Sequence, residues 1–293
     1  MGEFRREDWC AARLSADREL GLPTWLGRTD VTAVAYVFGT PERMPRYARA
    51  IELALRETYR WCGRLRTTLV VNRPTAELES FAAECGNLLR IDVDESLKPG
   101  DIVGFSRNMI RTLPERFDTP YLLNVHPDGF PLREGFDAFV GRWDYIGGPW
   151  EIGHDDWITR RLLTRHDGAG NGGFALRTRR ICEAGAAAYR RFWKILPDCY
   201  LLYEDVFFTR FLPRWQPNYA RRISLASREE AARFALCENC AAQDAFGGLP
   251  FGFHSWKALE RLQVQGLWRD EPASPNPRAP APRDWRGPGR WWP

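Results

Sequence analysis

Asp128 is the residue whose sequence surroundings most clearly indicate chemistry. It follows the apolar run 121–125 and lies between Pro127 and Gly129. Pro127 cannot donate to a β-ladder and Gly129 tolerates unusual dihedrals, so both favour the end of a strand and free Asp128 from regular pairing. In open α/β sheets, ligands bind beyond the carboxyl ends of the strands. The sequence therefore predicts that Asp128 faces a ligand site.

A second acidic pair, Glu204 and Asp205, interrupts an otherwise apolar run over residues 200–208. Burial is costly for an unpaired carboxylate and raises its pKa, which is the condition wanted for general acid–base catalysis. The two residues are therefore candidate catalytic groups. A salt bridge to one of the many arginines is the structural alternative.

Residues 168–177 predict a glycine-rich turn that leads into an apolar run. Glycines allow the backbone to approach a ligand closely and to offer amide donors to its oxygens. From composition alone, this segment is equally consistent with an ordinary turn.

The elements that position these groups alternate between strand and helix. Apolar β-rich runs predict strands at 31–38, 65–71, 88–93 and 121–125. Helical periodicity follows at 40–59 with Thr40 as the expected N-cap, at 75–85 with Thr75 as the N-cap and Gly86 as the stop, and at 101–113. Because parallel crossovers need a helix, this order predicts an α/β fold with a mainly parallel sheet flanked by helices.

Beyond residue 130 the pattern changes. We expect a short aromatic strand or turn at 144–150, a polar loop at 151–169, and helices at 178–193 and 227–237. The sequence predicts three regions: an N-terminal extension (1–30), one catalytic domain (31–268), and a disordered tail rich in proline, arginine and tryptophan (269–293).

The composition is that of a globular protein with a mild preference for anions. Hydrophobic residues make up 44% of the 293 residues, and 42 basic side chains face 38 acidic ones, for a net charge of +4. All basic residues except Lys98, Lys194 and Lys257 are arginine, which suits forked phosphate recognition, although a coding bias explains the excess equally well.

The seven cysteines are odd in number and scattered, which suits a reducing compartment. The N-terminus lacks the apolar core of a signal peptide, and no run of eighteen apolar residues predicts a membrane span. We therefore expect a cytoplasmic protein. The pair Cys237 and Cys240 has no second pair to complete a zinc site, so buried thiols are the expected state.

Five short motifs occur in a recognisable order. They are His126-Pro-Asp-Gly-Phe130, Asp144-Tyr-Ile-Gly-Gly-Pro-Trp150, Gly170-Asn-Gly-Gly-Phe174, Tyr203-Glu-Asp-Val206 and Pro250-Phe-Gly-Phe-His254. This order resembles the GT-A-type glycosyltransferases, and more closely a poorly characterised glycosyltransferase-like family with such signatures, over about residues 31–256. The resemblance implies a GT-A-like, Rossmann-like fold and transfer of a sugar from a nucleotide-sugar donor to an acceptor hydroxyl.

The resemblance implies that Asp128 and His254 hold a divalent metal ion. His126 and Pro127 stand where the full Asp-X-Asp motif places its first two residues. Mg²⁺ can bind through one carboxylate plus substrate phosphates, whereas an imidazole ligand favours Mn²⁺. His126 is either a further ligand or a structural residue at the strand end.

The resemblance also assigns roles in donor binding, acceptor binding and catalysis. Asp205 is expected to act as the base of an inverting transfer, and Glu204 to bind the acceptor hydroxyl. The donor is expected at Phe38, Gly39, Thr40, Arg107, Asn108, Asp128, Gly172 and Gly173. The aromatic residues Tyr145, Trp150 and Phe174 are expected to stack on a sugar.

Two other acidic groups compete with Asp128 as metal ligands. The literal Asp92-Val-Asp94 places both aspartates on one face of its strand, which suits a solvated strand end. Asp155 and Asp156 beside His154 lie in a long polar loop, where such residues accumulate readily. Asp92-Val-Asp94 also comes too early in the chain for the order that the resemblance implies.

The acceptor and the functional class stay open at this point. A glycan is one acceptor, and a hydroxymethylated DNA base is another, because arginines gather in the tail and aromatic residues could hold a flipped base. A non-catalytic nucleotide- or carbohydrate-binding module of the same ancestry is the alternative to an enzyme. A third hypothesis is an interaction protein that docks through its C-terminal tail.

Overall fold

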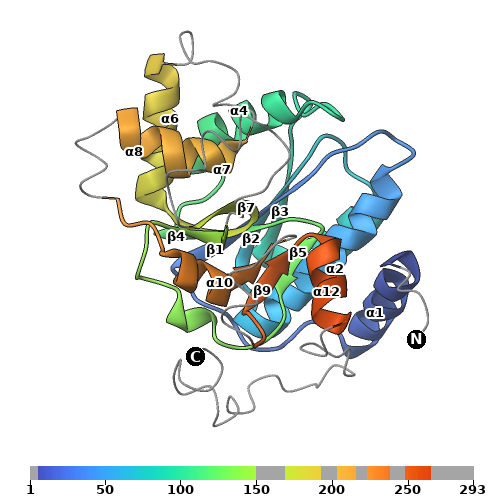
Figure 1. The fold of residues 1–293 in the computed structure, drawn as a ribbon. Helices are drawn as coiled ribbons and strands as arrows, with labels where there is room; N and C mark the ends of the chain where they lie inside the picture. Colours follow the sequence, from blue (N-terminus) through green and yellow to red (C-terminus); the bar gives the residue numbers. More distant parts are fainter. Residues whose placement is uncertain (1–5, 150–168, 193–202, 216–222, 238–247, 265–293) are drawn as a thin grey trace.

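The computed structural model describes residues 6–149, 169–192, 203–215, 223–237 and 248–264 (Figure 1). Its centre is a six-stranded sheet with the order β3-β2-β1-β4-β7-β6. The strands are β1 (Val31–Val37), β2 (Arg66–Val71), β3 (Leu89–Val93), β4 (Tyr121–Val125), β6 (Tyr145–Pro149) and β7 (Ala169–Thr178).

Four of these strands are parallel. β1 pairs in parallel with both β2 and β4, and β2 pairs in parallel with β3. β7 is antiparallel to β4, and β6 is antiparallel to β7. The expected α/β fold with a mainly parallel sheet is therefore confirmed.

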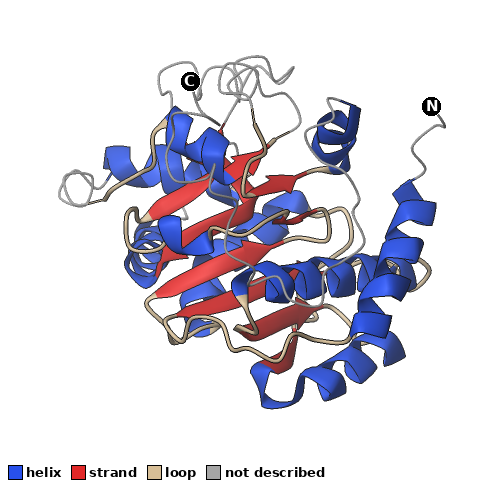
Figure 2. Ribbon diagram, turned by 90° about the horizontal axis from the view of Figure 1, so that it is seen from below, coloured by secondary structure: helices blue, strands red, loops and turns tan. Residues whose placement is uncertain are grey.

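Helices cover both faces of the sheet (Figures 1 and 2). One face carries α2 (Met44–Cys62) and α3 (Ala76–Cys85), with α1 (Arg6–Leu20) packed on α2. The other face carries α4 (Ile102–Thr112), α6 (Arg179–Phe192), α7 (Glu204–Val206) and α8 (Leu212–Trp215), with a π-helical turn over Phe207–Phe211 between the last two.

A second, three-stranded sheet lies on the α2 side of the molecule. It has the order β5-β9-β8, with β5 (Gly129–Pro131), β9 (Gly252–His254) and β8 (Ala235–Leu236). Two helices flank it, α10 (Arg228–Phe234) and α12 (Trp256–Val264). Because β5 follows β4 directly and contacts α2, this small sheet is fixed at the carboxyl edge of the large one.

Local signals explain both ends of α3. Thr75 caps α3 by accepting from the backbone N–H of Leu78, and Gly86 ends that helix with a φ of 61°, as expected. The predicted cap at Thr40 is wrong. Its hydroxyl is hydrogen-bonded to Glu42, residues 41–43 form a turn, and α2 begins only at Met44.

The glycine-rich segment is the second correction. Instead of a turn, Ala169–Thr178 is a continuous strand that pairs with β4 on one side and β6 on the other. The register against β6 shifts at Gly147 and Gly148. The backbones approach so closely there that a side chain at Gly147 would collide with the carbonyl of Asn171. The glycines allow the backbones of β6 and β7 to approach each other closely, and they do not mark a reversal of the chain.

Several expectations lie outside the described residues. They are residues 151–168 of the expected polar loop (151–169), with His154, Asp155 and Asp156, the side chains of Trp150 and Cys240, and the C-terminal tail 269–293. Within the described ranges, no helix combines the length and the apolar character needed to cross a bilayer.

Candidate functional site at the carboxyl edge

The chain brings three side chains that could hold a metal ion, hereafter the metal cluster, together where β4 ends. His126 follows the last residue of β4, and Asp128 precedes β5. β9 pairs with β5 in an antiparallel register that sets His254 opposite Gly129. A short ladder therefore places two segments more than a hundred residues apart at one point of the sheet edge.

The ligand atoms of His126, Asp128 and His254 all lie within 4.8 Å of one another. Nε2 of His254 is 3.5 Å from Oδ1 of Asp128, and the two imidazole rings meet edge-on with centroids 5.7 Å apart. All three side chains are partly exposed. Two ligands that are each about 2.1 Å from an ion are at most about 4.2 Å apart, so a small closure would place one ion among them.

The charges of the cluster also suit a cation. Burial would raise the pKa of Asp128, but His254 outweighs it and lowers that pKa to about 2. Burial lowers the pKa of His126 to about 4, so this ring is neutral near pH 7. Nε2 of His126 is buried without a hydrogen-bond partner, which is the state of a nitrogen that awaits a ligand. The residues present therefore fit a divalent ion.

Two partly buried aromatic rings adjoin the cluster. Phe38, just beyond β1, lies 4.9 Å from Phe105 of α4, and Phe105 lies 6.1 Å from the ring of His126. A planar ring with an open face can stack on a nucleobase. Phe38 was expected from the sequence, whereas Phe105 was not, because its helical spacing indicated only a core position.

β7 passes between the metal cluster and the acidic pair. A Cβ atom on Gly173 would lie 2.0 Å from Nε2 of His254, and one on Gly172 would lie 2.2 Å from Oε1 of Glu204. Neighbouring residues of a strand face opposite sides, so Gly173 leaves room for His254 on one face of β7 and Gly172 leaves room for Glu204 on the other. This strand is the element that sets the spacing between them.

Glu204 and Asp205 are both buried at the start of α7, with 6% of each residue exposed. Oε1 of Glu204 accepts from Nη2 of Arg177 at 2.9 Å, so the salt bridge considered from the sequence is present. Asp205 accepts the backbone N–H of Gly172 at 2.9 Å and that of Val206 at 2.7 Å. Burial, followed by the charge of Glu204, raises the pKa of Asp205 to about 8.

Two residues that connect these groups were not anticipated. Asn124 is fully buried on β4, and its amide donates to the carbonyl of Gly172 at 2.6 Å. Arg177 is fully buried on β7, and its guanidinium lies 5.1 Å from the ring of Tyr145. An arginine at the end of an apolar run was the available sequence signal for Arg177. Asn124 had none, because one polar residue within a strand is common.

Among the expected donor residues, Gly39 and Asn108 serve internal contacts. The side chain of Asn72 bonds both the N–H and the carbonyl of Gly39, which ties the ends of β1 and β2 together. Asn108 is buried and donates to Asp94 at 2.9 Å. Thr40 and Arg107 are partly exposed at this edge.

The literal Asp-X-Asp on β3 is not at a solvated face, contrary to expectation. Arg116 reaches both carboxylates, at 3.2 Å from Asp92 and 2.7 Å from Asp94, while Val93 on the other face is 53% exposed. The alternation was predicted correctly, but α4 and the following turn cover the acidic face. These aspartates neutralise a partly buried arginine.

The expected acceptor aromatics lie in the core. Tyr145 and Phe174 are 0% exposed, so neither ring has a face open to a sugar. Tyr145 donates to the carbonyl of Gly170, and Phe174 stacks on Phe234. Cys237 is buried as expected and hydrogen-bonds to His254 from the side of β8.

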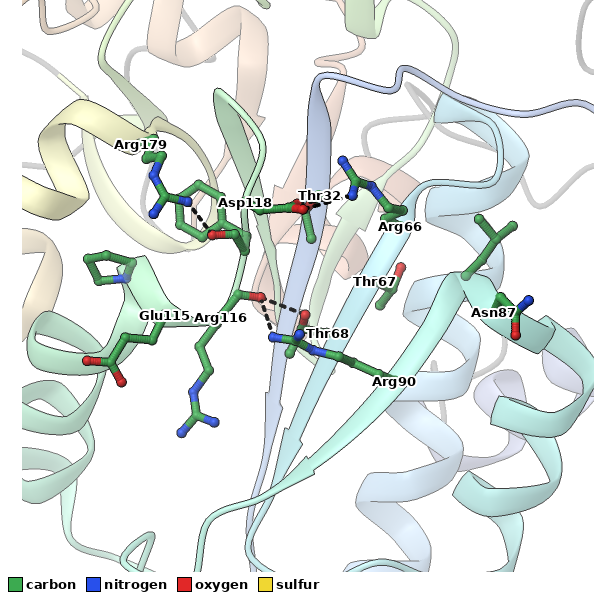
Figure 3. Close-up of a pocket in the computed structure, with 13 residues that line it drawn as sticks. Thr32, Arg66, Thr67, Thr68, Asn87, Arg90, Glu115, Arg116, Asp118 and Arg179 are labelled. Atoms are coloured by element: carbon green, nitrogen blue, oxygen red, sulfur yellow. Dashed lines mark hydrogen bonds and ion pairs between the residues drawn. The ribbon is translucent and has the colours of Figure 1, made fainter.

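Two clefts lie at opposite edges of the large sheet. One of about 470 Å³ lies beyond β2 and β3 at the carboxyl edge and is lined by Asn72 and Leu97 among others. Another of about 480 Å³ lies at the amino edge (Figure 3). Its arginines are paired, Arg66 with Asp118 and Arg179 with Glu183, so their charges are compensated. The chemistry gathers at the carboxyl edge.

A family model described as a protein of unknown function (DUF5672) matches residues 102–254, just over half of the chain. The chain therefore belongs to that family. The match spans every residue of the metal cluster and the acidic pair. No curated protein matches the sequence significantly.

Solved structures of glycosyltransferases are distantly similar. The galactosyltransferase LgtC with donor and acceptor sugar analogues has 12% identity and a TM-score of 0.46, with 88% of this chain and 99% of that chain covered. The mannosyltransferase Ktr4p from S. cerevisiae with GDP has 9% identity and a TM-score of 0.43, with 79% of each chain covered. Core-mannan synthase A from Aspergillus fumigatus in its Mn/GDP form has 10% identity and a TM-score of 0.43, with 63% of this chain and 69% of that chain covered.

Proposed function

We propose that the chain is a glycosyltransferase that moves a sugar from a nucleotide-sugar donor to an acceptor hydroxyl with the help of a divalent metal ion. The observation that carries the proposal is the grouping of His126, Asp128 and His254 at the carboxyl edge of the sheet. The motifs that contain these residues are the ones that resemble GT-A-type enzymes. An ion held there would neutralise charge on the leaving diphosphate.

The ligand set favours Mn²⁺ over Mg²⁺. Two imidazoles and one carboxylate form the cluster, and Mg²⁺ prefers oxygen ligands throughout. His126 takes the place of the first acid of an Asp-X-Asp motif in this arrangement. The departure from the family pattern therefore changes the preferred ion while keeping the site.

The nucleotide is proposed to lie over the ends of β1, β2 and β3. Phe38 and Phe105 offer partly exposed rings beside the metal cluster, and the cleft of about 470 Å³ lies along the same edge at Asn72. Thr40 and Arg107, which are partly exposed at this edge, are proposed to contact ribose or phosphate.

Asp205 is proposed to accept the proton of the acceptor hydroxyl. In an inverting transfer the acceptor oxygen forms its bond to the anomeric carbon while the bond from that carbon to the donor phosphate breaks, and the hydroxyl proton passes to the base. Arg177 pairs with Glu204, and burial followed by the charge of Glu204 raises the pKa of Asp205. Because the base must be ionised, the rate should rise with pH through about 8.

A release assay tests this function. Purified protein is incubated with a panel of nucleotide sugars and with glycan or hydroxymethylated DNA acceptors, in Mn²⁺, Mg²⁺ or chelator, and free nucleotide is measured. We expect release from one donor in Mn²⁺ and loss of release in Asp128→Asn. Asp92→Asn is the matched control, because it alters an aspartate outside the cluster. No release from any donor would contradict the proposal.

The same structure favours one alternative, a non-catalytic nucleotide- or carbohydrate-binding module. Both oxygens of Asp205 already accept backbone N–H groups, and Glu204 is paired, which are features of structural carboxylates. Metal-dependent binding of a nucleotide sugar without turnover on any acceptor would identify the chain as such a module.

A further inference from the structure

The chain turns sharply immediately after His254. Ser255 has a φ of 89°, and within the described ranges it is the one residue other than glycine with a positive φ. Side chains other than glycine rarely adopt this conformation, and it persists only where the surrounding contacts impose it. Such strain is concentrated at functional sites, so the contacts of Ser255 indicate the role of this turn.

One backbone hydrogen bond of Ser255 leads directly to the metal cluster, whereas its hydroxyl accepts the N–H of Lys257 in α12 at 3.3 Å. The backbone N–H of Ser255 donates to the carbonyl oxygen of Asp128 at 2.7 Å. Its own carbonyl accepts from the N–H of Ala258 at 3.0 Å, which begins α12, and only 6% of the residue is exposed. One backbone unit therefore joins the residue next to His254 to the backbone of Asp128.

The next residue holds the turn in place. The ring of Trp256 lies 6.3 Å from Phe130 and 6.3 Å from Phe253, measured between centroids. Phe130 and Phe253 are the paired central residues of β5 and β9, so the ring covers the ladder that carries both ligands. Trp9 of α1 contacts Trp256 from the outside at 6.0 Å. The packing opposes any relaxation of Ser255.

We propose that Ser255 is a positioning residue for the metal site, whose positive-φ turn fixes Asp128 and His254 relative to each other before an ion binds. The proposal rests on the proposed function, because it takes His126, Asp128 and His254 as the ligands. It predicts that the conformation of residue 255, and not its hydroxyl, determines the affinity of the site. Loss of a group that orients metal ligands typically weakens binding about 10–100-fold.

Four variants separate conformation from chemistry: Ser255→Gly, Ser255→Asn, Ser255→Ala and Ser255→Val. Glycine and asparagine tolerate a positive φ, alanine does so poorly, and a β-branched residue does so least. The affinity for Mn²⁺ is measured by electron paramagnetic resonance of the free ion, and the absorption of bound Co²⁺ reports on the ligands. We expect Ser255→Gly and Ser255→Asn to stay within about threefold of wild type, and Ser255→Val to lose about 10–100-fold with an altered Co²⁺ spectrum.

The outcomes are distinguishable. Equal affinity in all folded variants would overturn the positioning role, and so would a loss in Ser255→Gly as large as in Ser255→Val, because the hydroxyl would then be the cause. If Ser255→Val does not fold, the comparison of Ser255→Ala with Ser255→Gly decides the question in the same way. If wild type binds neither Mn²⁺ nor Co²⁺, the proposed metal site itself fails, and this inference fails with it.

Discussion

At the scale of single residues, His126 distinguishes the proposed metal site from one built on carboxylates alone. It stands two residues before Asp128 and supplies a second imidazole beside His254. Burial lowers its pKa to about 4, so its lone pair is available at neutral pH without loss of a proton. An aspartate in this position would add a negative charge and an oxygen ligand, which would suit a harder cation.

Substitution of His126 tests this selectivity. We expect His126→Asp to shift the preference of the site from Mn²⁺ toward Mg²⁺, because it recreates two carboxylates separated by one residue. His126→Ala should weaken Mn²⁺ binding by about tenfold or more. Titration calorimetry with each ion measures both effects. An unchanged ratio of the two affinities in His126→Asp would show that His126 is not a ligand.

Asp205→Asn tests the catalytic assignment. We expect turnover to fall by about 10²–10⁴-fold, because the proton acceptor is lost, while the affinity for the donor stays within about threefold. The amide group of the variant would face one of the two backbone N–H donors, so the free energy of unfolding should fall by about 1–2 kcal/mol. Steady-state kinetics and chemical denaturation measure these quantities. Turnover near that of wild type would remove Asp205 from catalysis.

At the scale of elements, β7 carries the geometry of the whole site. Gly173 contacts His254 on one face of the strand, and Gly172 contacts Glu204 on the other. Strand β4 is held to β7 by Asn124, whose side-chain amide donates to the carbonyl of Gly172. The position of β7 therefore sets both the metal cluster and the acidic pair.

The two adjacent glycines form a matched pair of variants. Gly173→Ala should displace His254 and weaken Mn²⁺ binding by about tenfold or more, because the added Cβ would lie 2.0 Å from Nε2. Gly172→Ala should leave Mn²⁺ affinity near wild type, since its Cβ would meet Glu204 and Arg177 instead. Both should lower the free energy of unfolding by about 1–3 kcal/mol. The same Mn²⁺ affinity in both variants would contradict this division of the strand.

The contact between α1 and α2 predicts a pH dependence of stability. Asp17 is 1% exposed and bonds Arg60, while burial, followed by the charge of Glu57, raises its pKa to about 6. The folded state therefore binds more protons than the unfolded state between about pH 4 and 6, so this group lowers stability as pH rises through that window.

Asp17→Asn removes this titration. Relative to wild type, its free energy of unfolding should increase by about 1–3 kcal/mol from pH 4 to 6 and change little above pH 7. Denaturant unfolding at several pH values measures the difference, with Asp118→Asn as a control at an exposed ion pair. A difference that is constant across this range would mean that Asp17 titrates normally.

At the scale of the whole molecule, local signals and hydrophobic periodicity predicted the architecture well. The run 31–38 predicted β1 because its residues are buried on both faces, and Thr75 and Gly86 bounded α3 because caps act within one turn. The resemblance paired Asp128 with His254 and left His126 as either a ligand or a structural residue, and the structure places all three side chains together.

The rest depends on contacts between distant segments. β7 was taken for a turn because Gly172 and Gly173 are required by Glu204 and His254, neither of which is a local neighbour in the sequence. The burial of Tyr145 and Phe174 follows from strand pairing, which composition does not reveal. The cover over Asp92 likewise comes from Arg116, 24 residues further along.

Titration calorimetry of a nucleotide-sugar panel, with Mn²⁺ or with chelator, tests the central claim most directly. We predict that wild type binds one donor in Mn²⁺ and loses that binding in chelator, that Asp128→Asn and His254→Ala lose it in either condition, and that Asp92→Asn retains it. Donor binding that is indifferent to the ion, or that survives in Asp128→Asn and His254→Ala, would contradict a metal-assisted donor site at the carboxyl edge.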